Sequence, residues 1–431
     1  MTSVAEVSAS LQEILTGVAD KMGRESGFIQ RRRKLSGASF VQTLVFGWLA
    51  SPTASLSELS QAAATCGVVI SGQGLAERFS AAGAACLRGV LEASIEQLIS
   101  GEGETMGLLR RFNGVYIQDS TIIGLPVALR DVWAGCGNQN QASAGLKIQT
   151  VFEYGTGRLQ LSLHAARQSD QCLQTTQLPT GSLRLADTGY FSVTRFQALQ
   201  ARGVHWLSRV PAKVCIVDDI RSWSLLDWLL EHAPDGMVDT SVQLTHQRFA
   251  CRLLAYRVPP EVAAQRRAHL QLAFARRNRP PSPMAFALCE WTILATDLPA
   301  TALTLPEALI FLRCRWQIEL LFKLWKSYLH LAHSRSAHPW RILCEVYAKL
   351  IAVLVQHWLL LLGASETLDR SWFKALPTIQ KHAFHLATVL YDTLRLRLAL
   401  TAISAAIARC RATKRRTNPS TFQRLEALLS P

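Results

Sequence analysis

The feature that most constrains this fold is a change in the spacing of apolar residues along the chain. Apolar residues recur at helical spacing through about the first hundred residues, alternate from Gly114 onward, and return to helical spacing after Pro306. Alternation is typical of strands that bury one face, whereas helical spacing is typical of helices that bury one stripe. The sequence therefore predicts a central α/β region between two helical regions.

The central region predicts a definite order of elements. The expected elements are a strand at 114–125, a hairpin at 145–166, a strand at 181–191, a helix at 192–202 and a strand at 203–211. A three-strand meander followed by strand, helix and strand, with a later helix, is the element order of a ribonuclease-H-like domain. The predicted fold class is α/β, a ribonuclease-H-like mixed sheet with a β-rich insertion, flanked by helical N- and C-terminal regions.

These patterns divide the 431 residues into five regions. They are a helical N-terminal region that binds DNA at 1–108, the first part of the catalytic core at 109–211, a β-rich insertion at 212–300, the second part of the core at 301–345, and a helical C-terminal region with a basic tail at 346–431. The chain is longer than one compact core usually organises, so several domains are expected.

The charge balance indicates a polyanionic partner. The 46 Lys and Arg residues outnumber the 31 Asp and Glu residues, which gives a formal net charge of +15 and favours nucleic acid or an anionic membrane surface. The most membrane-like run, 350–363, is short and is interrupted by Gln356 and His357, so we expect a buried bundle helix and no membrane partner.

Several common classes of site and location are disfavoured by the sequence. The ten cysteines form no C-x-x-C pair and have no clustered histidines, which argues against a zinc ribbon and against a disulfide framework. The N-terminus shows no basic segment followed by an apolar one, so we expect no secretory signal. The expected location is the cytoplasm, in association with the nucleoid.

Residues 55–98 contain two helical runs joined by a turn near 67–74. Ser55 or Ser57 would cap the first run, with Glu58 in its opening turn. The residues that would open the second run, where side chains could reach a DNA groove, are Gln73, Glu77 and Arg78. The pattern fits a helix-turn-helix and a plain helical hairpin equally well.

Two basic segments add to the possible DNA contacts. Arg31, Arg32 and Arg33 stand just before an apolar helix, and we expect them to contact phosphates or to form a solvated linker. The basic tail at 409–420 fits DNA contact and disordered solvation equally.

Three carboxylates occupy positions that the predicted fold would bring together. Asp119 is expected at the end of the first strand, Asp187 at the end of the fourth, and Glu319 on the late helix. Because the first and fourth strands are neighbours in the expected sheet, the three side chains would converge and suit Mg²⁺ or Mn²⁺. Two such ions activate a water or a 3′-hydroxyl for in-line displacement at phosphorus. Considered singly, each aspartate also fits an ordinary turn, and Glu319 also fits a surface ion pair.

The late helix has a charged stripe on an otherwise apolar surface. Arg315, Glu319 and Lys326 are four and seven residues apart, which places them within about 40° of one another around the helix. If Glu319 is a metal ligand, Arg315 and Lys326 are expected to bind the phosphates beside it.

Three segments together resemble DDE transposases of bacterial insertion sequences. The segments are "YIQDST" at 116–121, "LADTGYFS" at 185–192 and "RWQIELLFKLWK" at 315–326. The resemblance is to the IS-four-like family, whose signature is Tyr-(2)-Arg-(3)-Glu-(6)-Lys. Three of the four signature positions match, and Leu312 stands where the family has its tyrosine.

The resemblance implies roles for these residues. Asp119, Asp187 and Glu319 would be the catalytic carboxylates and the ligands of Mg²⁺, for which Mn²⁺ could substitute. Gly189 and Tyr190 fill the Asp-x-Gly-Tyr pattern of the second segment, with Tyr190 among the DNA contacts. The family further implies a homodimer on paired ends, and excision through hairpins at the ends of the element.

The function predicted from the sequence is that of a metal-dependent insertion-sequence transposase. It would bind terminal inverted repeats and target double-stranded DNA, and catalyse strand cleavage and strand transfer. One alternative is a structure-specific nuclease on the same fold. Another is a catalytically decayed or domesticated DNA-binding protein, with Leu312 as a first sign of decay. A membrane-surface protein is disfavoured because it would not explain the three carboxylates.

Overall fold

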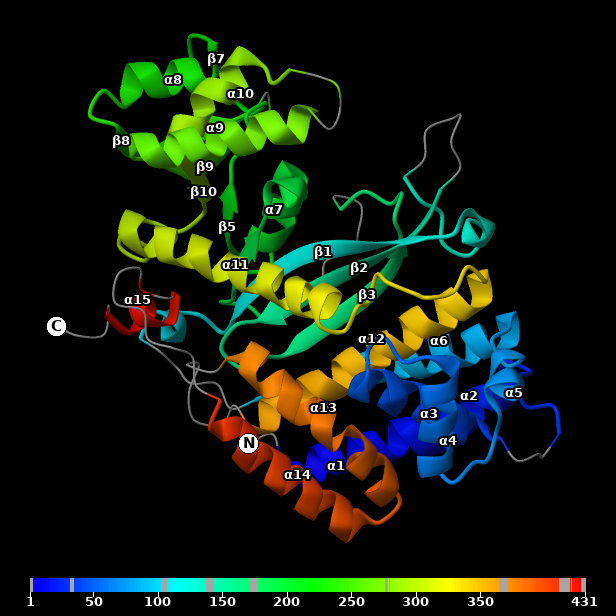
Figure 1. The fold of residues 1–431 in the computed structure, drawn as a ribbon. Coiled ribbons are helices and arrows are strands. Elements are labelled where there is room, and N and C mark those ends of the chain that lie inside the picture. The colour runs from blue at the N-terminus through cyan, green and yellow to red at the C-terminus, as the bar shows by residue number, and fades with distance from the viewer. Residues whose placement is uncertain are drawn as a thin grey trace. The chain divides into compact units, whose positions relative to one another are not determined.

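The computed structural model describes residues 3–31, 35–101, 107–136, 143–170, 177–245, 247–275, 278, 280–363, 371–410, 419 and 421–427. Their contacts divide the chain into two compact units, and Figure 1 shows the elements of both. Unit 1 comprises Met1–Met106, Asp119–Ser169 and Trp316–Pro431. Unit 2 comprises Gly107–Gln118 and Asp170–Arg315. The strand β1 (Val115–Leu125) and the helix α11 (Leu305–Ser327) each contribute residues to both units.

Unit 1 is mainly helical, as the apolar spacing predicts. Its N-terminal helices are α1 (Val4–Gln12), α2 (Ala19–Glu25), α3 (Gly37–Ala50), α4 (Leu56–Thr65), α5 (Gly72–Ala76) and α6 (Ala81–Glu96). Its later helices are the end of α11 (Leu305–Ser327), α12 (Pro339–Leu362), α13 (Trp372–Val389), α14 (Thr393–Ala408) and α15 (Thr421–Ala427). The helix α12 contacts α1, α3, α6, α13 and α14.

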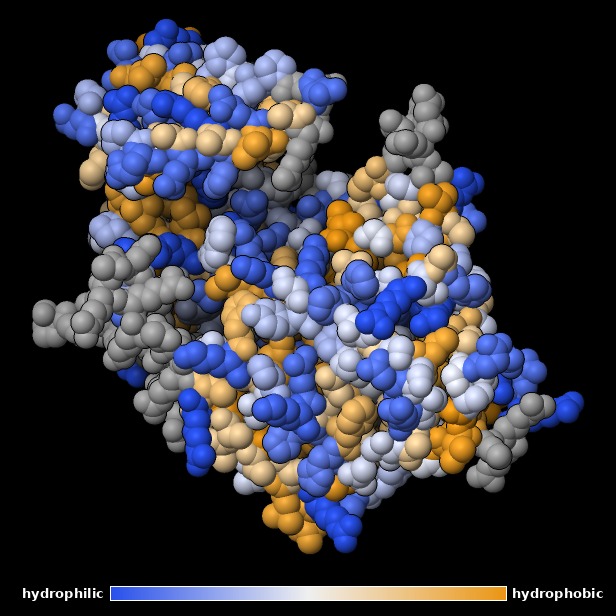
Figure 2. Space-filling model, viewed as in Figure 1, coloured by the Kyte–Doolittle hydropathy of each residue, from blue (hydrophilic) through white to orange (hydrophobic). Residues whose placement is uncertain are grey.

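The helix α12 is long and apolar enough to cross a membrane, but its apolar window is wholly buried among the other helices of unit 1. The surface over α1, α13 and α14 mixes hydrophilic and hydrophobic residues in Figure 2. The prediction of a buried bundle helix at 350–363 is therefore confirmed.

The N-terminal helices differ in one respect from the expectation. Ser55 caps α4 through a capping box with Glu58, as predicted. The second helical run, however, is two helices, because Ser71 caps the short α5 and Ser80 caps α6. Each serine side chain accepts a hydrogen bond from a backbone N–H three residues later, so each begins a new helix.

The strands follow the predicted order. They are β1 (Val115–Leu125), β2 (Ala144–Glu153), β3 (Leu159–Ala165), β4 (Leu183–Ala186), β5 (His205–Arg209), β6 (Cys215–Val217), β7 (Ser222–Ser224), β8 (Met237–Leu244), β9 (Phe249–Arg257) and β10 (Trp291–Thr296). In unit 1 the strand order is β3-β2-β1, and in unit 2 it is β1-β4-β5-β10-β9-β8-β6-β7. The β2–β3 hairpin is antiparallel, whereas β1, β4 and β5 are parallel. This is a mixed α/β architecture with flanking helices.

The predicted insertion extends the sheet of unit 2. Its strand β10 pairs antiparallel with β5, and β9 and β8 continue from β10. The insertion also contains the helices α8 (Leu225–His232), α9 (Pro260–Ala275) and α10 (Pro283–Ala287), and α7 (Val193–Gln200) connects β4 to β5. Strands separated by a long stretch of sequence therefore share one sheet.

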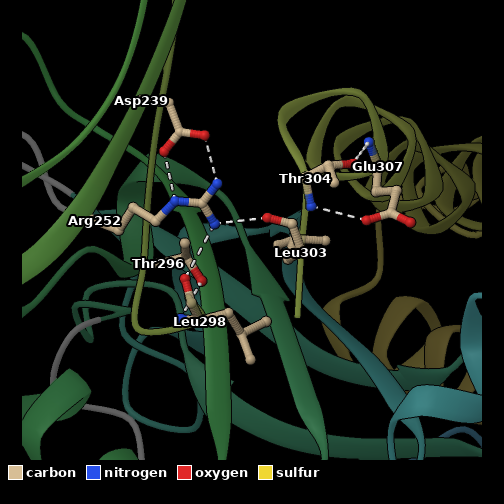
Figure 3. A network of polar contacts seen from close by, with 7 residues as sticks. All are labelled: Asp239, Arg252, Thr296, Leu298, Leu303, Thr304 and Glu307. Carbon is tan, nitrogen blue, oxygen red and sulfur yellow. Dashed lines mark hydrogen bonds and ion pairs between the residues drawn. The ribbon is translucent and has the colours of Figure 1, made fainter. Parts of the chain in front are cut away.

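A buried arginine joins the insertion to the start of α11 (Figure 3). Arg252 on β9 donates from Nε and Nη2 to the two carboxylate oxygens of Asp239 on β8, at 2.6 and 2.6 Å. Its Nη1 donates to the carbonyl oxygens of Leu298 and Leu303, at 3.2 and 2.6 Å. One guanidinium thus holds both ends of the segment that leads into α11.

The first turn of α11 is fixed next to that segment. The Thr304 N–H donates to the Glu307 carboxylate at 2.8 Å, and Arg111 forms an ion pair with Glu307 at 2.9 Å. Arg111 also donates to the carbonyl oxygen of Ala302. Burial raises the pKa of the Glu307 carboxyl, but the bonds from Thr304 and Arg111 outweigh it and leave this pKa below its usual value.

We predict that Arg252→Lys loosens the entry to α11. A lysine cannot donate to Asp239 in a bidentate manner and also reach both carbonyl oxygens, so we expect a loss of about 2 kcal/mol or more in the free energy of unfolding. Urea unfolding measures this loss, and amide hydrogen exchange at residues 298–307 locates it. The exposed Arg248→Lys is the control, with an expected change within about 0.5 kcal/mol. Equal stability of the two variants would contradict the assigned role.

Burial of His357 on α12 predicts a pH dependence of stability. Its Nε2 lies 2.7 Å from the carbonyl oxygen of Gly157, so the neutral ring donates there, and burial lowers its pKa to about 4 from 6.5. The unfolded chain binds the proton more readily, so the free energy of unfolding falls as the pH drops below 6.5 towards about 4.

His357→Gln keeps a donor for Gly157 but does not titrate. Between about pH 7 and about pH 5.5, the natural chain is expected to lose about 1 kcal/mol more stability than this variant. Urea unfolding at the two pH values tests this, since every other titrating group is common to both proteins. Parallel pH profiles would show that His357 does not set the dependence.

Candidate active site

The parallel pairing of β1 with β4 brings the approaches to two predicted carboxylates side by side. The register pairs Val115 with Leu183 and continues to Gln118 with Ala186. Asp119 directly follows Gln118, and Asp187 directly follows Ala186. Asp187 directly follows β4, as predicted. The prediction that Asp119 ends its strand is wrong, because β1 continues to Leu125.

Alternation along each strand predicts which face its aspartate follows. Asp119 has the parity of Val115 and Ile117 on β1, and Asp187 has the parity of Leu183 and Leu185 on β4. These four apolar residues are buried. Asp119 and Asp187 are half-buried. On each strand, the row of buried apolar residues is therefore followed by an aspartate.

Local hydrogen bonds shape the chain at both aspartates. One carboxylate oxygen of Asp119 accepts from the backbone N–H of Ser120 at 2.8 Å. The carbonyl oxygen of Asp187 accepts from the N–H of Tyr190 at 2.9 Å and opens the short 3₁₀ helix Thr188–Tyr190. The main chain thus turns immediately after Asp187.

A buried arginine lies on the opposite face of the two strands. Arg184 on β4 donates from Nε and Nη2 to the Gln118 side-chain oxygen, at 2.8 and 2.6 Å. Burial, with a smaller effect of Arg195, lowers the pKa of Arg184 to about 9.

Tyr190 lies beside this arginine and is buried. The Arg184 guanidinium is 5.8 Å from the centre of the Tyr190 ring. Tyr190 was predicted to contact DNA, whereas no role was predicted for Arg184. An arginine within a short apolar strand has no distinctive sequence pattern. Its burial, three residues before Asp187, becomes evident only in the structure.

A further carboxylate near Asp187 was also missed. The Asp170 carboxylate is close enough to Gly189 that a β-carbon at that glycine would lie 3.8 Å from its Oδ2. Arg195 on α7 donates to the carbonyl oxygen of Asp170 at 3.4 Å. Asp170 belongs to a connection that has neither alternating apolar residues nor a motif, so nothing in the local pattern indicated it.

The stripe predicted on α11 is present but is unevenly exposed. Arg315 is 8% exposed, Glu319 is half-buried, and Lys326 is exposed, with partial desolvation that lowers its pKa below the usual value. In unit 2, Arg315 and Leu312 line a small cavity of about 10 Å³ together with Ala186 and Arg209. Arg315 therefore packs next to the residue that precedes Asp187. No role was predicted for Arg209 from the sequence.

The three predicted carboxylates are divided between the two units. Asp119 and Glu319 belong to unit 1, and Asp187 belongs to unit 2. Within the part of the chain that the structure describes, no group of three or more His, Cys, Asp or Glu side chains is placed to hold a metal ion. The donor set itself, carboxylate oxygens, suits Mg²⁺ and Mn²⁺. A metal site at Asp119, Asp187 and Glu319 stays a prediction.

The basic segments are only partly described. Arg31 is exposed, whereas Arg32 and Arg33 lie outside the described residues. Most of the basic tail, at 411–418, also lies outside them. The DNA contacts expected of these residues stay predictions.

Comparison with known proteins gives a consistent result. Residues 110–355, more than half of the chain, match the family described as "Transposase DDE domain". The transposase for insertion sequence element IS231C of Bacillus thuringiensis subsp. berliner is 27% identical over 403 residues, which cover 86% of this chain and 84% of that protein. The transposase for insertion sequence element IS1151 of Clostridium perfringens is 23% identical over 382 residues, covering 81% and 79%.

The matched region includes Asp119, Asp187 and Glu319, together with the paired strands and the helix described above. The similarity to the IS231C transposase extends well beyond this region at both ends of the chain, since it covers 86% of the residues. The chain therefore belongs to the transposase DDE domain family.

Proposed function

We propose that this protein is the transposase of a bacterial insertion sequence. It binds the terminal inverted repeats of its element and catalyses DNA strand cleavage and strand transfer. The observation that supports this most is the pairing of Gln118 on β1 with Ala186 on β4, because each of these residues directly precedes one of the two aspartates. The chain also belongs to a family named for its DDE carboxylates. Relatives named as insertion-sequence transposases, matched over 84% and 79% of their length, agree with it.

The proposed catalytic core is ribonuclease-H-like. Its support is the strand order β3-β2-β1 in unit 1 and β1-β4-β5 in unit 2, with β2 and β3 antiparallel and β1, β4 and β5 parallel. The IS-four-like subfamily is supported by Arg315, Glu319 and Lys326 at the signature spacing. Leu312 departs from that signature and lines the cavity beside Arg315.

In the proposed mechanism, Asp119, Asp187 and Glu319 hold divalent cations, Mg²⁺ or Mn²⁺. Two such ions, when bound, activate the attacking water or 3′-hydroxyl and stabilise the leaving oxygen of an in-line phosphoryl transfer. Asp119 and Asp187 supply oxygens from one face of the sheet, and Glu319 supplies its carboxylate from α11. Arg315 and Lys326 bind the phosphates that flank the scissile bond.

The partner is double-stranded DNA, both the element ends and the target. The net charge of +15 supports this, and affinity should fall steeply as salt rises because phosphate contacts release counterions. We further propose a homodimer on paired ends, excision through hairpins, and action in the cytoplasm at the nucleoid.

The decayed DNA-binding protein is retained as a second candidate because Leu312 replaces the signature tyrosine. A structure-specific nuclease is a third candidate, since it would need the same carboxylates. It differs in one outcome, because its cleaved ends would not join a target duplex. The three candidates therefore separate by cleavage and joining rather than by binding.

We predict that Glu319→Gln, Asp119→Asn and Asp187→Asn each lower Mg²⁺-dependent nicking at the element end by at least about a hundredfold, because each removes a charged ligand. Nicking of a labelled duplex, with EDTA as the blank, measures this, and DNA binding should persist. Asp131→Asn is the matched control, because Asp131 follows β1 but is exposed. A natural chain that binds but does not cut with either metal would favour the decayed protein.

A further inference from the structure

The N-terminal helices enclose a polar surface recess of about 430 Å³, entirely within unit 1. Two segments form its walls, the turn after α2 and the turn between α5 and α6. The lining side chains that bear charge or hydrogen-bonding groups are Gln30, Arg31, Glu77, Arg78 and Ser80. The first turn of α6 closes one side of the recess at Ala82.

Buried aromatic residues hold the two walls in place. Phe28, beside the first wall, has its ring centre 4.3 Å from that of Phe40 on α3. Phe79, beside the second wall, packs against the same Phe40 at 6.4 Å and against Trp48 at 6.4 Å. The positions of the polar side chains are thus set by a shared apolar base.

The approach of α6 to the second wall is equally tight. A β-carbon at Gly83 would lie 2.6 Å from the carbonyl oxygen of Arg78, so only glycine fits there without a shift. The N–H of Ser80 donates to that same carbonyl at 2.9 Å. These contacts hold the Arg78 main chain against the start of α6.

The chemistry of the lining favours an oxyanion. Two guanidinium groups, an amide and a hydroxyl provide many hydrogen-bond donors, and the recess is open because Gln30 and Arg31 are exposed. Glu77 is the opposing charge, but it is exposed and therefore screened by solvent. Guanidinium forks match the oxygens of a phosphate group.

We infer that this recess binds a backbone phosphate of the DNA duplex, with Arg31 and Arg78 as its ligands. The inference rests on the proposed function and extends it, since it assigns a DNA contact to one recess within the N-terminal helices. A phosphate contact sets position and does not read sequence. The recess therefore contributes equally to binding of the element end and of unrelated DNA.

The test measures binding of two labelled duplexes by fluorescence anisotropy, one with the element end and one of unrelated sequence. Arg31→Gln and Arg78→Gln should each weaken both duplexes by about tenfold and lower the slope of log K against log salt by about 0.9. Arg24→Gln, an exposed charge on α2 that does not line the recess, is the control and should change binding less than twofold.

A second pair of variants separates the recess from general charge. Ala82→Phe fills the recess without changing the charge of the chain, and should also weaken both duplexes by about tenfold, since it displaces the phosphate from the arginines. Ala81→Phe, on the same turn of α6 but exposed and outside the recess, should bind like the natural chain. Circular dichroism confirms that the variants compared are folded.

The contrary outcomes are distinct. If the natural chain binds and nicks DNA and the variants bind both duplexes equally well, only the assignment of a phosphate to the recess is overturned. A loss confined to the element-end duplex would show base reading and overturn the phosphate assignment. A thermal shift with inorganic phosphate that Arg78→Gln abolishes, without any change in duplex binding, would identify a free-anion site instead. A natural chain that binds neither duplex would overturn the proposed function together with this inference.

Discussion

The entry to α11 depends on one buried guanidinium. Arg252 donates hydrogen bonds to the Asp239 carboxylate and to the carbonyl oxygens of Leu298 and Leu303. A buried arginine is stable only when such partners are complete, because an unpaired charge away from water is costly. The insertion is therefore more than an appended domain, since its strands β8 and β9 fix the segment from which the helix of Arg315 and Glu319 begins.

The second constraint is the parallel register of β1 and β4. A shift of one residue in either strand would turn its aspartate to the opposite face of the sheet. The register is held by buried apolar pairs on one face and by the bond between Arg184 and Gln118 on the other. Both faces of the strand pair thus specify the same pairing of Gln118 with Ala186, the residues that precede Asp119 and Asp187.

Charge is used differently in the two parts of the proposed DNA-binding machinery. In unit 2, Arg184 and Arg315 are buried, so their charge acts through a medium that screens it weakly. In the N-terminal recess, Arg31 is exposed, so salt competes with its contact. Salt should therefore weaken DNA binding through the recess more than it weakens the electrostatics near Asp187.

The sequence by itself determined the order of elements, the three carboxylates as candidates, and the burial of the 350–363 helix. Such properties follow from the spacing of apolar residues in strands and helices, which can be read from short stretches of the sequence. The strand expected at 114–125 matches β1, but Asp119 was wrongly assigned to its end because polar residues such as Ser120 resemble a strand end. The start of α6 was missed because Ser80 was not recognised as a second cap within one helical run.

Only the tertiary structure decided which distant segments meet. The pairing of β10 with β5, the bonds of Arg252 to Leu298 and Leu303, and the packing of Arg315 beside Ala186 all join residues far apart in the sequence. None of these contacts has a local signature, since each depends on complementary shape and on the need to satisfy buried polar groups. The recess beside Arg78 arises in the same way, from two turns that share Phe40 as their base.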